Sequence, residues 1–177
     1  MSGKKLLENS NAMIKKTFEV NSIALAYTVK EFLPAMLEMN RGHIVTVASM
    51  AGVIATPGLA DYSASKAAAI GFDESLRAEL SNNNSNVTTT CVCPYFINTG
   101  MFDGVQTKFP SILPIVTSEY ASERIVDGIL KEEHQVVFPW FISLAFAFKG
   151  ILPPMLYDMA MGFFGANMVM KDFRGKM

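Results

Sequence analysis

Short β-branched runs alternate with longer helical patterns along this chain, and this alternation constrains the fold more than any other feature. The runs with strand character are Ile44–Ala48, Val87–Val92 and Gln135–Phe138. Apolar residues at helical spacing fill Ala12–Met39, Asp61–Leu80 and Thr117–Lys131. Such alternation is typical of a parallel sheet covered by helices. The sequence therefore predicts the α/β class, with about three strands and covering helices.

The first helical segment carries the longest apolar stripe, and it opens the chain before any strand. Its spaced apolar residues are Ile14, Phe18, Ile23, Leu25, Phe32, Leu33, Met36 and Leu37. Pro34 near its end predicts a kink. A sheet of three parallel strands leaves an apolar edge unpaired, which is an aggregation liability. We therefore expect a further segment to precede residue 1.

Charge and cysteine content exclude several classes of function. The net charge is −1, and the Lys and Arg residues are scattered, which argues against a nucleic-acid-binding protein. Cys91 and Cys93 are the only cysteines, and on a strand they point to the same face. We expect buried free thiols there, without a disulfide or a metal site.

The C-terminal third is strongly apolar from Val136 to Phe148 and again from Ile151 to Met170. Lys149, Asp158 and several prolines interrupt it, so we expect no membrane-spanning helix. Two interpretations stay open for residues 136–177: a buried core and substrate lid, or a surface that dips into a membrane interface. Trp140 and the phenylalanines suit the second.

The chemistry of the chain centres on three side chains. Tyr62 and Lys66 are four residues apart on a predicted helix, so they share one face. A nearby ammonium favours the phenolate, and a tyrosine tuned in this way exchanges a proton with a carbonyl or an alcohol. Ser49 follows the first strand and can hold the same substrate oxygen. Asn21 lies inside the first helix, where Asn is unfavourable, and this indicates a functional or kinking role.

These residues and the sequence segments around them resemble the short-chain dehydrogenase/reductase family. The resemblance is carried by Arg41–Ser49 and Asp61–Lys66, and it extends to Phe32–Met36 and Cys93–Phe102. The last two are similar to the retinol dehydrogenase and 17β-hydroxysteroid dehydrogenase type 11 branch of that family. The resemblance implies the C-terminal half of a doubly wound (Rossmann) sheet. Residues 1–135 would form the catalytic half, and residues 136–177 a segment facing the substrate or a membrane.

Site roles follow from the same resemblance. It implies that Tyr62 is the acid/base, that Lys66 lowers its pKa and binds the nicotinamide ribose, and that Ser49 orients the substrate oxygen. Asn21 would hold a water for proton relay. A loop after the second strand would touch the cofactor through Pro94, Ile97 and Thr99.

The sequence lacks the family's Gly-rich Thr-Gly-x-x-x-Gly-x-Gly turn, its Asn-Asn-Ala-Gly segment and its ribose-reading residue. We therefore expect a truncated isoform or an incomplete gene model, which begins just after that missing half.

The resemblance implies an oxidoreductase that moves a hydride between NAD or NADP, with NAD favoured, and a lipophilic alcohol or carbonyl such as retinol/retinal or a steroid. The alternative is a non-catalytic fragment that acts through dimerisation or membrane association. Expected partners are a homodimer mate, bound through the two long helices, and a membrane or lipid-droplet surface. The resemblance places the protein on the cytosolic face of the endoplasmic reticulum or a lipid droplet, or in the cytoplasm if an anchor is absent.

Overall fold

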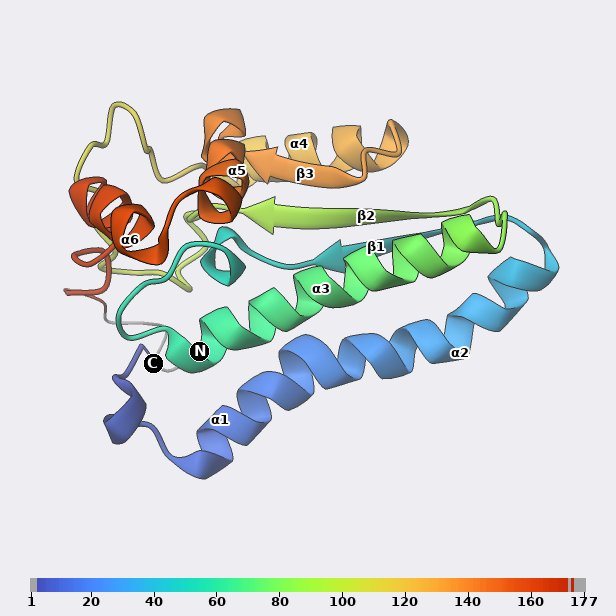
Figure 1. Ribbon diagram of the computed structural model, residues 1–177, viewed down its shortest axis with the longest axis horizontal. Coiled ribbons are helices and arrows are strands. Elements are labelled where there is room, and N and C mark those ends of the chain that lie inside the picture. The colour runs from blue at the N-terminus through green and yellow to red at the C-terminus, as the bar shows by residue number, and fades with distance from the viewer. Residues whose placement is uncertain (1–2, 172, 174–177) are drawn as a thin grey trace.

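The computed structural model describes residues 3–171 and 173, and its centre is a parallel sheet of three strands in the order β1-β2-β3. The strands are β1 (Gly42–Val47), β2 (Val87–Pro94) and β3 (Gln135–Phe138). Gly42 pairs with Val87, and Cys91 pairs with Gln135. The predicted strands and the α/β class are confirmed (Figure 1).

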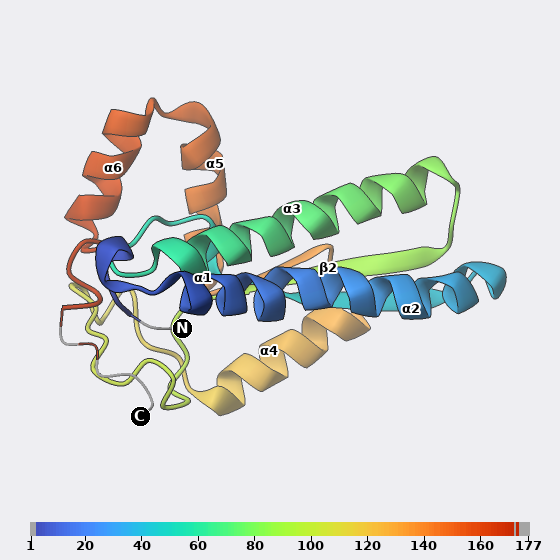
Figure 2. The same ribbon diagram turned by 90° about the horizontal axis from the view of Figure 1, so that it is seen from below.

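Long helices cover both faces of this sheet. The helix α3 (Ala60–Asn82) lies on one face, and α4 (Ser118–Leu130) lies on the other (Figures 1 and 2). The helices α1 (Asn11–Phe18) and α2 (Ala24–Glu38) run alongside α3, past the β1 edge of the sheet (Figure 1). The side chains of β2 alternate accordingly, since Cys91 joins the core on the α3 side and Val92 packs with Ala121 of α4. Alternation along a strand sends neighbouring residues to opposite faces.

The first helical segment departs from the expected stripe. A π turn over Glu19–Ile23 separates α1 from α2, whereas the helix continues through Pro34. The extra residue of a π turn rotates the following helix by about 100°. Residues before and after the turn therefore cannot share one stripe as predicted. Val29 is buried, whereas Ile23, Phe32 and Leu37 are exposed, so placing those three on the inner stripe was wrong.

Cys91 and Cys93 lie side by side beneath α3. Both are buried and free, with 3.7 Å between their Sγ atoms. The hydrogen bond with Cys93, with burial adding to it, raises the pKa of Cys91, so this thiol stays protonated at neutral pH. The prediction of two buried free thiols on one strand face is confirmed.

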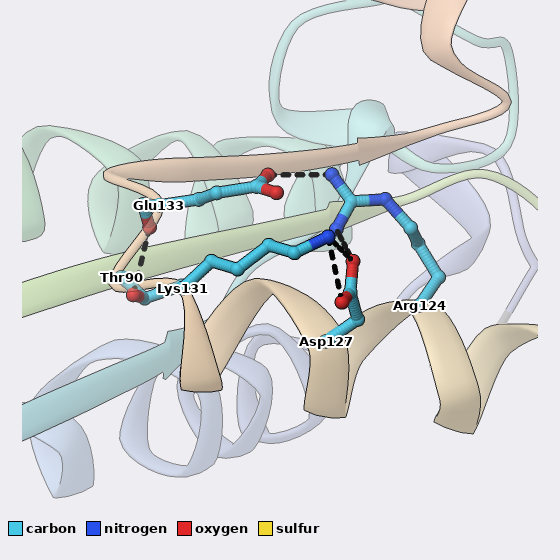
Figure 3. Close-up of polar contacts among 5 residues, drawn as sticks. All are labelled: Thr90, Arg124, Asp127, Lys131 and Glu133. Carbon is cyan, nitrogen blue, oxygen red and sulfur yellow. Dashed lines mark hydrogen bonds and ion pairs between the residues drawn. The ribbon is translucent and has the colours of Figure 1, made fainter.

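Polar contacts connect α4, the turn that precedes β3 and the middle of β2. Arg124 of α4 pairs with Glu133, and Asp127 accepts from Lys131, as Figure 3 shows. The Thr90 hydroxyl of β2 donates to the Glu133 carbonyl over 2.7 Å. His43 hydrogen-bonds to the same hydroxyl and is half-buried in β1.

The apolar C-terminal third folds back beyond the carboxyl ends of the strands. It forms a turn (Trp140–Ser143), then α5 (Leu144–Ile151) and α6 (Pro154–Phe163) (Figures 1 and 2). Among the described residues, no helix has both the length and the apolar content needed to cross a bilayer.

Candidate active site

Ser49 lies where β1 ends and its chain turns toward α3. Its side chain accepts a hydrogen bond from the Ala51 N–H at 3.1 Å and so caps the short turn Met50–Gly52. Gly52 allows this turn to lie against α3, since a Cβ built on it would come within 2.8 Å of the Ala67 nitrogen. The close backbone contact places Ser49 beside the first turn of α3.

Tyr62 belongs to that first turn and is only 7% exposed. Burial raises the pKa of Tyr62, and the Ser49 side chain lies near enough to oppose this shift by hydrogen bonding. The expectation that Lys66 lowers the pKa of Tyr62 stays a prediction, since burial and the Ser49 hydroxyl are the two influences on this phenol in the structure. Because desolvation dominates, the phenol is protonated at neutral pH.

Lys66 lies one helical turn further along α3, as its spacing predicts. Its ammonium donates to the Val47 carbonyl over 2.7 Å and lies 5.8 Å from the centre of the Tyr62 ring. Burial lowers the pKa of Lys66, although the nearby Cys93 and Cys91 partly oppose this. The lysine is thus held at the carboxyl end of β1, beside the phenol.

Asn21 reaches α3 from the π turn, but it does so behind the phenol. Its Nδ2 donates to Ser65 Oγ over 3.0 Å, and Ser65 Oγ donates to the Tyr62 carbonyl over 2.7 Å. Ser22 adds a bond to the Ser65 carbonyl at 2.9 Å. Asn21 therefore supports the backbone that carries Tyr62. The sequence predicts a functional or kinking role for Asn21, and the residue lies in the π turn.

A second buried contact, which sequence reasoning missed, holds the start of α3. Thr17 Oγ1 of α1 donates to Asp61 Oδ2 over 3.0 Å, and both residues are almost fully buried. Asp61 immediately precedes Tyr62. The one available signal was a Thr inside an otherwise apolar helical face, and it does not specify its partner.

The predicted cofactor loop leaves the carboxyl end of β2. Pro94 ends the strand, Ile97 forms an isolated bridge with Val116, and the Thr99 N–H donates to the Ile97 carbonyl over 2.9 Å. Gly100 follows with φ +77°, a conformation that favours glycine. The loop therefore lies at the same sheet edge as Ser49, because carboxyl ends of parallel strands share one edge.

An apolar pocket opens beside Ser49, with about 590 Å³ of space that includes its mouth. Carbon atoms dominate its wall, which comes from distant segments: Met50, Ala51, Ile54, Thr56, Pro94, Tyr95, Phe96, Phe102, Leu113, Met161, Phe164, Ala166 and Val169. Phe102 meets the Tyr62 ring edge-on, at 6.5 Å between centroids. Sequence reasoning missed most of this wall, because separate loops and α6 supply it.

The arrangement has acid/base and orienting groups beside an apolar space. Within residues 3–171 and 173, no cluster of three His, Cys, Asp or Glu side chains could hold a metal ion. The groups suited to a nicotinamide ribose are the Lys66 ammonium and the Tyr62 hydroxyl, while Thr99 is exposed on the adjoining loop.

Comparisons with known proteins identify the family. The short chain dehydrogenase family model matches residues 1–109. Short-chain dehydrogenase/reductase family 16C member 6 of Bos taurus is 41% identical over 98% of this chain and 55% of its own length. Epidermal retinol dehydrogenase 2 of Mus musculus is 40% identical over 99% of this chain and 57% of its own length.

A solved structure supports the fold alone. A short chain dehydrogenase from Burkholderia cenocepacia, crystallised with NADP, superposes with a TM-score of 0.69 at 22% identity. The superposition covers 88% of this chain and 62% of that one. The chain spans about half the length of the curated relatives it matches.

Proposed function

The chain belongs to the short-chain dehydrogenase family, and from this premise we propose that it serves as an NAD(P)-linked oxidoreductase of lipophilic alcohols or carbonyls. The observation that carries the proposal is the placement of the Ser49 and Tyr62 side chains together, at the edge of an apolar pocket. Retinol/retinal and steroids are the substrate classes that the resemblance favours.

The residues present fit the nicotinamide end of such a cofactor. Lys66 and Tyr62 offer groups to ribose hydroxyls at the carboxyl end of β1, and the loop with Ile97 and Thr99 borders the same edge. The sequence contains no Gly-rich turn for the pyrophosphate. When bound, the cofactor supplies or accepts the hydride.

The chain's own residues would transfer the proton and position the substrate oxygen. The protonated Tyr62 phenol donates to a carbonyl oxygen as it becomes an alkoxide, and Ser49 holds that oxygen in place. Burial raises the pKa of Tyr62, so the phenol keeps its proton at neutral pH and can act as the acid in carbonyl reduction. Alcohol oxidation needs the phenolate and should rise toward alkaline pH.

The pocket wall favours an apolar substrate over a polar one. Ser49, Thr56 and Tyr95 carry the side-chain hydroxyls of the described wall, and its other side chains are apolar. Burial in such a wall stabilises apolar ligands by about 25 cal/mol per Å² of apolar surface. The names of the relatives, which include a retinol dehydrogenase, add support for a retinoid.

The test measures reduction of retinal by the purified chain with NADH and with NADPH. Tyr62→Phe should lower the rate by about 100-fold or more, the usual contribution of a positioned acid. Tyr120→Phe is the matched control, because Tyr120 is a half-exposed residue of α4 on the other face of the sheet. Equal rates for Tyr62→Phe and wild type would overturn the proposed mechanism.

We also propose that the chain pairs with a second copy through α2 and α3. The outer face of α2 exposes Tyr27 and Phe32, at 69% and 61%. Beside it, α3 presents Ala67, Ala68 and Gly71, small residues that allow close approach. Sedimentation equilibrium should show a dimer that Tyr27→Glu disrupts, and a monomeric wild type would contradict the pairing.

A lipid surface is the proposed partner of the outer sides of α5 and α6. Trp140, Ile151, Met155 and Phe163 are between 63% and 77% exposed there. Exposed apolar helices with an interfacial Trp are typical of membrane-surface contact. Trp140 is the only Trp, so its emission should shift to the blue on addition of phosphatidylcholine vesicles. An unchanged spectrum would contradict this contact.

A further inference from the structure

A second hollow lies directly beside the apolar pocket, between the loop that leads into α3 and the helix α6. It contains about 1070 Å³ of space, which includes its open mouth. Thr56, Met161 and Ala166 line both hollows. The two hollows therefore adjoin along these three side chains, and Met161 is the longest and most flexible of them.

The second hollow differs from the first in its polar groups. Ser63, Asp158 and Asn167 line it together with Thr56, whereas none of the first three lines the apolar pocket. Asp158 and Asn167 are exposed at the rim. Polar groups at one end of an otherwise apolar space fix the orientation of a ligand.

Ser63 supplies an independent sign that a ligand belongs there. Its Oγ is buried and has no hydrogen-bond partner among the described residues. A buried hydroxyl without a partner is unfavourable, and such orphans are rare in native proteins. Ser63 immediately follows Tyr62 in α3, and because consecutive helix residues point in different directions, its side chain lines the second hollow and not the apolar pocket.

Charge at the rim restricts what can enter. Asp158 and Tyr157 are the ionisable side chains of the lining, and the Tyr157 hydroxyl already donates to the Val53 carbonyl over 3.3 Å. Lys149, the basic residue of neighbouring α5, donates to that same carbonyl over 3.0 Å. An anionic ligand end would therefore meet the Asp158 carboxylate without a cation among the described residues of the lining.

We propose that this second hollow is a subsite for the distal polar end of an elongated, uncharged substrate. It rests on the proposed function, since the reacting end of that substrate lies in the apolar pocket beside Ser49. Ser63 and Asn167 hydrogen-bond a distal hydroxyl or carbonyl oxygen. Asp158 accepts from a hydroxyl and repels a carboxylate, which makes the site selective for neutral diols over hydroxy acids.

The test is calorimetric binding of three matched ligand series to the purified chain: linear primary alcohols, α,ω-diols and ω-hydroxy carboxylates of increasing length. At the chain length that spans both hollows, the diol should bind about three- to tenfold tighter than the alcohol, the value of one added hydrogen bond. The hydroxy carboxylate should bind more weakly than the diol by about tenfold or more.

Single substitutions separate the contributions of the lining. Ser63→Ala should remove the advantage of the diol and leave alcohol binding unchanged. Asp158→Asn should bring the hydroxy carboxylate to within about threefold of the diol. Gly162→Leu should fill the hollow and weaken diol binding without weakening alcohol binding, because the nearest described atom to a Cβ built there is Asn167 Nδ2, at 4.0 Å. The thermal midpoint of each variant checks that it folds.

The outcomes distinguish this inference from the proposed function. If alcohols bind but diols gain nothing at any length, the subsite is overturned and the apolar pocket stands. A Ser63→Ala variant that keeps the full advantage of the diol also overturns it. If no member of the three series binds, the lipophilic substrate and the subsite are both overturned.

Discussion

Replacement of Asp73 by Asn should stabilise the fold at neutral pH, although Asp73 lies in the centre of α3. Its side chain is fully buried against the sheet. Oδ2 accepts from Thr89 Oγ1 at 3.3 Å, whereas Oδ1 and the nearby Thr46 Oγ1 have no well-formed hydrogen bond among the described residues. An amide has the same shape without the charge, and its N–H₂ can donate to Thr46.

The expected gain follows from the free energy of burying a polar group without a full set of partners. Such a group destabilises a fold by about 1 to 3 kcal/mol, and we expect Asp73→Asn to recover an amount in this range. Burial raises the pKa of Asp73, and the hydroxyls of Thr46 and Thr89 offset this only in part. Asp73→Ala should instead destabilise by a similar amount, because it leaves Thr89 without its partner.

The pH dependence of stability independently predicts that Asp73→Asn stabilises the fold. With a folded pKa above the ordinary 3.8, Asp73 contributes stability below 3.8 that is lost as pH rises through its folded value. The advantage of Asp73→Asn over wild type should therefore grow from acidic to neutral pH and then level off. Urea unfolding followed by circular dichroism at several pH values measures it. An advantage that is independent of pH, or a variant less stable than wild type at neutral pH, would refute this reasoning.

Three further predictions concern packing and titration. Gly52→Ala should destabilise by about 1 to 3 kcal/mol and slow turnover, because the new methyl meets the α3 backbone at 2.8 Å. Scanning calorimetry tests the loss of stability, and the retinal assay tests the turnover. An unchanged rate would contradict the prediction that the Gly52 contact positions the site. Phe138→Ala should cost about 3 to 5 kcal/mol, since Phe138 is 0% exposed; urea unfolding checks this, and a loss under about 1 kcal/mol would contradict it. Burial raises the pKa of Tyr95 from its ordinary value of 10.0 to about 12. The protonated phenol therefore contributes stability in full below pH 10, and this contribution is lost as the pH rises through about 12. Ultraviolet titration of wild type against Tyr95→Phe should reveal this late phase, and identical curves would contradict it.

The sequence predicted the groups that local geometry places. A spacing of four residues puts Tyr62 and Lys66 on one helix face, and a polar residue after a β-branched strand puts Ser49 at the sheet edge. Cys91 and Cys93 obey the period of two in the same way. Each of these predictions depended only on the geometry of a single helix or strand.

What escaped prediction depends on contacts between distant elements. The π turn at Asn21 rotates α2; the unfavourable Asn in the helix indicated an irregularity there, but it did not specify a π turn or the rotation. The pocket wall combines Phe102 with Met161 and Phe164 of the C-terminal segment, which the sequence left open between a lid and a membrane surface. The raised pKa of Tyr62 results from burial, which a charge-based expectation from Lys66 could not include.

The most direct test of the central claim follows a labelled hydrogen in a single turnover. The purified chain is mixed with retinal and with NADH or NADPH deuterated at C4 of the nicotinamide, and the product is analysed by mass spectrometry. We predict retinol with one deuterium at its carbinol carbon, formed by wild type and Tyr120→Phe but about 100-fold more slowly by Tyr62→Phe. Absence of deuterated product with either cofactor, or equal rates for Tyr62→Phe and wild type, would contradict the assignment of Ser49, Tyr62 and Lys66 as the site of an oxidoreductase.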